Sequence, residues 1–350
     1  MPVATIPPRE IVREAVLVGV GYFTNKTLMD EDFPILAGAH KDTMNLSRLL
    51  TKRYGYKHED ITILVDSEDA PPESWPTRQN IIDAMEKLVA GKQAGDHIVF
   101  SFSGHGCQIE ALIEGDEEDD MDEILLPINV TVDRQSKDYY VDFIRDNEIR
   151  DIFVNKLAPG VHCSLIFDCC HSGTASDLPN VLVQSPIITP DSPYFSFSTT
   201  SPRTTAPARA PGSFARMDTL HDGHIDDTAA LCMQPSARSG NAWYLDDREV
   251  TSWSACLDEQ STFGKKSGGI FMKAFTKTLD AKPNPTHKDL LRELRKNILH
   301  VTEEENAKLQ TRWQTGLLPR GSPQPEEYVA PRPQLGSLRP DSILLDTFTL

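Results

Sequence analysis

The chain has 350 residues, of which 39% are hydrophobic and 25% are charged, ordinary proportions for a globular protein with a full core. Its net charge of −17 at pH 7 argues against nucleic acid as a partner, because such a partner needs a basic face. The acidity suits a cationic substrate or a hard metal ion, or it serves solubility alone. No apolar run reaches the roughly 18 residues of a membrane-spanning helix, so no membrane partner is expected.

The cysteines and the N-terminus indicate where the protein resides. Six cysteines in 350 residues are too sparse for a disulfide scaffold, and Cys163, Cys169, Cys170 and Cys256 lie in or beside apolar strands, which suits reduced thiols. The N-terminus lacks the basic and then apolar pattern of a signal peptide. A cytoplasmic location, or a nuclear one, is therefore expected.

The first half of the chain alternates strands and helices, a pattern that predicts a parallel sheet with helices on both faces. The strands are expected at 14–23, 61–65, 96–103, 124–127 and 162–168, and the helices at 38–54, 78–90 and 146–157. Met44, Leu46, Leu49 and Leu50 form the expected buried stripe of the first helix, and Thr77 caps the second.

The second half begins with a stretch of different composition. Residues 180–247 are rich in Pro, Ser and Thr with little periodicity, which indicates a flexible linker. A strand at 248–256, helices at 270–279 and 288–305 (the latter capped by Thr286), and a closing strand at 342–350 are expected after it. The sequence thus predicts an N-terminal arm (1–13), a large region (14–179), the linker (180–247), and a smaller region (248–350) that completes the same domain.

Two of the predicted strands end in residues that can carry chemistry. His105 lies between Gly104 and Gly106 after one strand, and Cys170 follows Asp168 and Cys169 after another. A thiol becomes a nucleophile only as the thiolate, so it needs a base such as an imidazole nearby. The amides of Gly106 and Cys170 are candidate donors for an oxyanion hole. A packed cysteine and a loop histidine are the structural alternative, whereas a zinc site at Cys169, Cys170 and His171 has poor ligand spacing.

These segments resemble the histidine and cysteine boxes of the metacaspases, which belong to the caspase-like clan of cysteine peptidases. The resemblance rests on Ser101–Gly106 and Asp168–Thr174, and it continues in the acidic run 116–123 with Pro127 and in 254–261. It implies an α/β, caspase-like sandwich with a mostly parallel central sheet flanked by helices on both faces. It also implies a cysteine endopeptidase with Cys170 as nucleophile and His105 as general base.

The resemblance further implies a substrate pocket that favours a basic side chain. Asp42, Ser103 and Asp168 match the floor and wall of the primary specificity pocket, and two buried carboxylates favour a guanidinium or ammonium group. Cleavage of proteins or peptides after Arg or Lys is therefore expected, from a monomer. Both aspartates also have a purely structural interpretation. Asp42 would be a carboxylate that stabilises a helix N-terminus, and Asp168 would be a structural hydrogen-bond acceptor.

Calcium activation and self-processing are also implied. The positions that match the family's calcium ligands are Asp122, Asp146, Asn147 and Asp177, and Asn147 replaces the usual aspartate, which predicts weaker binding of Ca²⁺. A solvated loop is the alternative for the acidic run. In the linker, Arg203, Arg209, Arg216 and Arg238 are candidate self-cleavage sites. The competing hypothesis is a metacaspase-like scaffold or regulatory protein that binds basic or unfolded partners without cleaving them.

Overall fold

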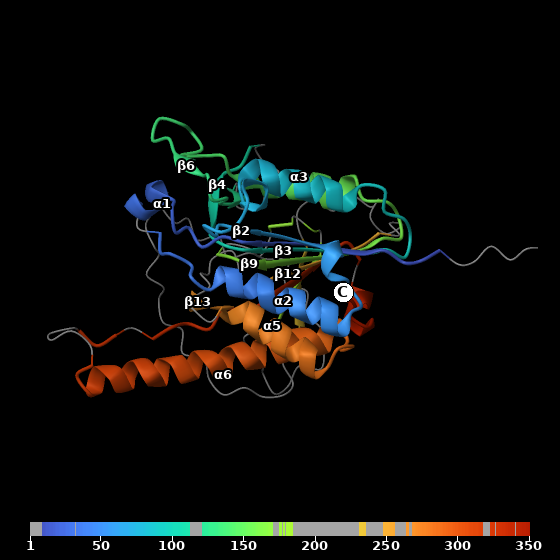
Figure 1. The fold of residues 1–350 in the computed structure, drawn as a ribbon. Helices are drawn as coiled ribbons and strands as arrows, with labels where there is room; N and C mark the ends of the chain where they lie inside the picture. The colour runs from blue at the N-terminus through green and yellow to red at the C-terminus, as the bar shows by residue number, and fades with distance from the viewer. Residues whose placement is uncertain are drawn as a thin grey trace, which may run out of the picture.

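The centre of the structure is an eight-stranded sheet in the order β11-β10-β15-β12-β9-β3-β1-β2 (Figure 1). It is taken from a computed structural model that describes residues 9–31, 33–112, 121–170, 175–176, 178, 180–184, 231–235, 248–255, 264–265, 268–317, 323–325, 327–339 and 341–350. The parallel strands are β1 (Arg13–Gly19), β2 (Ile61–Val65), β3 (His97–Ser103), β9 (His162–Asp168) and β12 (Glu249–Ser254). The antiparallel ones are β15 (Gln334–Ser337), β10 (Asn180–Gln184) and β11 (Leu231–Pro235).

Helices cover both faces of this sheet, as the α/β prediction requires (Figure 1). One face carries α2 (Ala39–Arg53), α5 (Ile270–Ala281) and α6 (His287–Gln314), and the other carries α3 (Arg78–Val89) and α4 (Asp146–Arg150), which continues as a π-helical turn, Asp151–Asn155. Alternate residues of β1 point to the two layers: Val16 and Val18 pack with α3, whereas Ala15 and Leu17 pack with α2. A strand buried on both faces therefore reads as the continuous apolar run seen in the sequence.

Smaller elements surround the edge of the sheet where the parallel strands end. They are α1 (Lys26–Asp30), the three-stranded sheet β4 (Gly106–Glu110), β5 (Met121–Leu125) and β8 (Ile144–Arg145), and the pairs β6 (Thr131–Val132) with β7 (Tyr140–Val141) and β13 (Gly264–Lys265) with β14 (Gly268–Gly269). Short 3₁₀ turns lie at His58–Asp60, Pro72–Ser74 and Asp341–Leu345. Because β4 directly follows the His105 turn, this small sheet frames the candidate site.

Two helix starts were predicted from capping residues, those of α3 and α6. The Thr77 side chain accepts the Asn80 N–H at 3.3 Å, and the Thr286 side chain accepts the Asp289 N–H at 3.1 Å. Both predicted caps are therefore confirmed.

The structure differs from the expected elements at several places, most clearly where pairing between distant strands completes the sheet. Residues 342–350 form a 3₁₀ turn and a single bridge rather than a closing strand; that place in the sheet belongs to β15, which lies in a proline-rich segment. Strands β10 and β11 lie inside the stretch treated as linker, and α6 continues to Gln314 instead of ending near 305. Met44 is 53% exposed, because the buried stripe of α2 runs through Asp42, Thr43, Leu46 and Leu50 at helical spacing.

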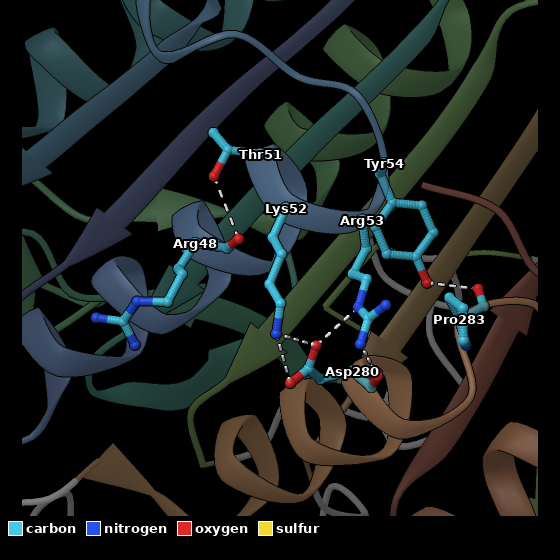
Figure 2. Close-up of polar contacts among 7 residues, drawn as sticks. All are labelled: Arg48, Thr51, Lys52, Arg53, Tyr54, Asp280 and Pro283. Atoms are coloured by element: carbon cyan, nitrogen blue, oxygen red, sulfur yellow. Dashed lines mark hydrogen bonds and ion pairs between the residues drawn. The ribbon is translucent and has the colours of Figure 1, made fainter.

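The end of α2 is joined to the end of α5 by polar contacts (Figure 2). Lys52 Nζ and Arg53 Nε both donate to Asp280 Oδ1, at 2.9 and 2.8 Å, and the Tyr54 hydroxyl donates to the Pro283 carbonyl at 2.7 Å. These contacts lie at the end of α2 opposite to Asp42. Among the described residues, no helix has both the length and the apolar character needed to cross a membrane.

Candidate active site

The register of two neighbouring strands brings His105 and Cys170 to one edge of the sheet. Ser103, the last residue of β3, is paired with Asp168, the last residue of β9. His105 and Cys170 each follow two residues later, and the Gly104 N–H donates to the Asp168 carbonyl at 3.3 Å. The two turns therefore remain hydrogen-bonded to each other beyond the strands.

Gly106 allows the closest approach of the two turns. A Cβ atom at this position would lie 2.3 Å from the Cys170 carbonyl oxygen and 3.4 Å from Cys169 Sγ. Any side chain here would push the cysteine turn away, so the glycine is required by packing. Its backbone consequently lies directly against the segment that carries the thiol.

His105 is held as a neutral base. Its Nε2 lies 2.8 Å from the Pro34 carbonyl oxygen, which only accepts hydrogen bonds, so the proton is assigned to Nε2 and Nδ1 keeps its lone pair. The side chain is buried against Phe33, with ring centroids 5.0 Å apart. This burial lowers the pKa of His105 to about 4, although the Pro34 hydrogen bond opposes the effect. At neutral pH the imidazole is therefore free to accept a proton.

The cysteines around this turn have different environments. Cys169 is fully buried in the core, whereas Cys170 is half-buried, so Cys170 is the more accessible of the adjacent pair. A third thiol, Cys107, is half-buried with Sγ 3.9 Å from the Tyr140 hydroxyl, and burial raises its pKa to about 12. A thiol with so high a pKa stays protonated, which leaves Cys170 as the candidate nucleophile.

A buried acidic pair lies beside this turn. Asp42, on the first turn of α2, and Asp168 are 2% and 6% exposed. The Gly269 N–H donates to both carboxylate oxygens of Asp42, at 3.1 and 2.9 Å, and the Met272 N–H donates to Asp168 Oδ2 at 3.0 Å. Both carboxylates therefore also hold the N-terminus of α5.

Burial makes the ionised form of Asp42 unfavourable beside Asp168. Burial and then the charge of Asp168 raise the pKa of Asp42 to about 8, whereas the Gly269 N–H and Lys273 act in the opposite direction. Ser103 pairs with Asp168 across strands β3 and β9, so the two side chains lie on the same face of the sheet. The buried Oγ of Ser103 has no hydrogen-bond partner within the described part of the chain. A guest that brings a positive charge and several donors would satisfy all three groups.

Gly268 and Gly269 shape this pocket. A Cβ atom at Gly268 would lie 2.4 Å from Asp42 Oδ1, and one at Gly269 would lie 2.1 Å from Asp168 Oδ2. Their importance was not predicted, and neither was that of Pro34 and Cys107. The adjacent glycines before a helix are the one signal in the sequence that pointed to a close approach.

The expected calcium ligands are brought together only in part. Asp122 on β5 accepts the Leu112 N–H at 3.1 Å and forms an ion pair with Arg145. Asp146, which opens α4, has a pKa raised to about 7 by burial and by the charge of Asp122. Asn147 follows it, and its buried Oδ1 has no hydrogen-bond partner among the described residues.

Hard oxygen donors and a repelling carboxylate pair fit a calcium ion, although Arg145 already neutralises Asp122. No cluster of three or more acidic, histidine or cysteine side chains with metal-site geometry occurs in the described ranges. Asp177, His171, residues 116–120, residues 256–261 and the linker arginines Arg203, Arg209, Arg216 and Arg238 all lie outside the described residues.

Comparisons with known proteins identify relatives of this chain. Residues 13–179 match the model of the "Metacaspase, peptidase C14 domain" family, a range that runs from β1 past Cys170. The chain is 33% identical to Metacaspase-1B of Aspergillus oryzae over 82% of its own length and 64% of that protein. It is 32% identical to Metacaspase-1 of Ajellomyces capsulatus, again over 82% of its length, and covers 76% of that relative.

The solved structures that resemble the chain are more distant. The crystal structure of caspase-1 from Spodoptera frugiperda aligns with 97% of this chain and 95% of its own at 12% identity and a TM-score of 0.48. The crystal structure of protein GSU0716 from Geobacter sulfurreducens aligns with 81% of this chain and 88% of its own, at 15% identity and the same TM-score.

Proposed function

Because this chain belongs to the metacaspase family, a family of cysteine-type endopeptidases, we propose that it hydrolyses peptide bonds with Cys170 as nucleophile and His105 as base. The observation that carries the proposal is the β3–β9 register, which puts both residues two positions beyond paired strand ends. The neutral state of His105 supports it, because a charged imidazole could not accept the thiol proton.

The proposed reaction begins when Nδ1 of His105 takes the Cys170 thiol proton and the thiolate attacks the carbonyl carbon of the peptide bond. The negative charge moves to the carbonyl oxygen, where the N–H groups of Gly106 and Cys170 are the proposed donors. His105 then gives its proton to the leaving amine, and the C–N bond breaks to leave a thioester. Water, deprotonated by His105, hydrolyses the thioester and restores the thiol.

The proposed substrates carry Arg or Lys at the cleavage position. Burial and the charge of Asp168 keep a proton on Asp42 near neutral pH, and the Ser103 hydroxyl has no hydrogen-bond partner among the described residues. A guanidinium or ammonium group would ionise Asp42 and pair with it and with Asp168. An Asp side chain in the same pocket would bring a second negative charge beside Asp168 and could not ionise Asp42, which would disfavour its binding.

We also propose that Ca²⁺ binds through Asp122, Asp146, Asn147 and Asp177. The ion would supply positive charge to the buried Asp146, whose pKa burial and then the charge of Asp122 already raise. Self-processing after Arg203, Arg209, Arg216 or Arg238 would follow from the same specificity. Nicking of the linker in the wild type but not in Cys170→Ala is its test.

The function is tested with fluorogenic peptides that carry Arg, Lys or Asp before the reporter, with calcium or with a chelator. Hydrolysis after Arg and Lys by the wild type and by Cys163→Ala, but not by Cys170→Ala, is expected. Cys163 is the matched control, because it is a buried thiol near the other end of β9. Activity in Cys170→Ala, a preference for Asp, or binding of basic peptides without any hydrolysis would overturn the proposal, the last in favour of a scaffold.

A further inference from the structure

Tyr22, which no sequence motif singled out, adopts a left-handed backbone conformation next to the base. Its φ angle is +62° and its side chain is only 2% exposed. A non-glycine residue in this region is strained, so the surrounding structure must hold it there. Such strain often accompanies a functional constraint.

The side chain of Tyr22 contacts His105 in two ways. Its hydroxyl accepts the His105 backbone N–H at 2.8 Å and donates to the Leu126 carbonyl at 2.5 Å, while the Leu126 N–H donates to the His105 carbonyl at 3.1 Å. The centroid of its ring lies 4.6 Å from that of the His105 imidazole, with an angle of 34° between the ring planes. Phe33 also contacts this imidazole. Tyr22 thus fixes both the backbone and the ring plane of His105.

Asp66 holds the turn that contains Tyr22. This carboxylate, 3% exposed at the end of β2, accepts the Gly21 N–H at 2.6 Å and the Phe23 N–H at 3.4 Å, on either side of Tyr22. Its Oδ1 also lies 2.6 Å from His40 Nε2. His40 is on the first turn of α2, two residues before the pocket residue Asp42.

We propose that Asp66 and His40 are positioning residues that act through Tyr22 to hold His105 in its proton-accepting orientation. The proposal rests on the peptidase function proposed above. Because His40 and Asp42 belong to the same helical turn, the network also ties the orientation of the base to the segment that forms the specificity pocket. A merely structural role predicts that these residues affect stability alone.

The experiment pairs each variant with a matched control far from the site. Tyr22→Phe removes a buried hydroxyl, and Tyr54→Phe removes a partly buried one that also donates to a backbone carbonyl, that of Pro283 (Figure 2). Asp66→Asn neutralises a buried carboxylate that accepts two backbone amides and contacts one basic side chain. Asp96→Asn does the same near the other end of β3, where Asp96 accepts the Val12 and Gln93 amides and pairs with Arg9. His40→Gln and His40→Ala test whether a donor at this position restores the effect.

Two readouts are measured: kcat and KM with a peptide that carries Arg, and the rate of Cys170 alkylation by iodoacetamide across pH, followed by mass spectrometry. Tyr22→Phe and Asp66→Asn are expected to lower kcat by about tenfold or more with KM nearly unchanged, and to slow alkylation near neutral pH. Both controls should retain kcat within about twofold whatever stability they lose, and His40→Gln should retain more activity than His40→Ala.

The proposal is overturned if the site variants and their controls lose kcat and alkylation rate equally at equal loss of stability. Alkylation separates this result from failure of the proposed function. If the wild type alkylates rapidly but cleaves no peptide, the peptidase proposal fails, while an alkylation rate that depends on Tyr22 and Asp66 still supports the positioning role.

Discussion

Asp42→Asn should make the protein more stable while it removes the proposed basic specificity. The folded protein keeps a proton on Asp42 up to a pKa of about 8, whereas the unfolded chain releases it near 3.8. Because the folded state binds more protons in this window, the free energy of unfolding falls as the pH rises from about 4 to 8 and then levels off. Asparagine cannot ionise and still offers an oxygen to the Gly269 N–H.

The size of this effect follows from the two pKa values. Each pH unit between 3.8 and about 8 costs the folded protein about 1.4 kcal/mol, so the upper limit is roughly 5 kcal/mol at pH 8. Asp42 is 2% exposed, so solvent screens little of this cost. The gain in stability of Asp42→Asn over the wild type should therefore grow by about 1.4 kcal/mol for each pH unit between 5 and 8.

The assay is urea unfolding between pH 5 and 9 without calcium, with Cys170→Ala in both proteins so that no self-cleavage interferes. Asp280→Asn is the control, because Asp280 is exposed and paired with Lys52 and Arg53 (Figure 2), which lower its pKa. Asp280→Asn should instead lose a little stability at neutral pH because it breaks the ion pairs with Lys52 and Arg53. The loss should be smaller at high salt, which screens such pairs. If the Asp42→Asn difference were the same at pH 5 and pH 8, or if the variant were less stable at pH 8, the reasoning would be refuted.

Three further outcomes are expected. Gly269→Ala should cost about 1–3 kcal/mol in urea unfolding and lower kcat/KM for an Arg peptide at least tenfold, because the new Cβ would lie 2.1 Å from Asp168 Oδ2; unchanged kinetics would contradict this. The wild type should lose up to about 3 kcal/mol of stability as the pH falls from 6.5 to 4, because folding keeps His105 neutral while the unfolded chain binds the proton. His105→Gln should remove this dependence of the unfolding free energy on pH. If the variant and the wild type lost stability in parallel between pH 6.5 and 4, the role assigned to His105 would be wrong. Asn147→Asp should tighten Ca²⁺ binding roughly tenfold by adding a charged ligand beside Asp146, and equal calcium titrations of the two proteins would exclude Asn147 as a ligand.

The position of the candidate catalytic residues at the strand ends could be predicted because it depends on local patterns. An apolar run followed by a glycine-framed histidine, and another followed by Asp168, Cys169 and Cys170, place both reactive groups at the ends of strands, and parallel strands share that edge. What holds the site was not visible, because its contacts join distant segments. Pro34 orients His105 across 71 residues, and Gly269 contacts Asp42 across 227.

The sequence by itself determined the parallel strands, the capped helix starts and the candidate catalytic pair, because hydrophobic periodicity and helix caps depend on neighbouring residues. Only the tertiary structure decided which segments complete the sheet, as β15 in a proline-rich stretch shows, and how the base is oriented. The tertiary structure also decided that Asp42 is hard to ionise. Burial beside Asp168 raises the pKa of Asp42, and no single segment contains both carboxylates.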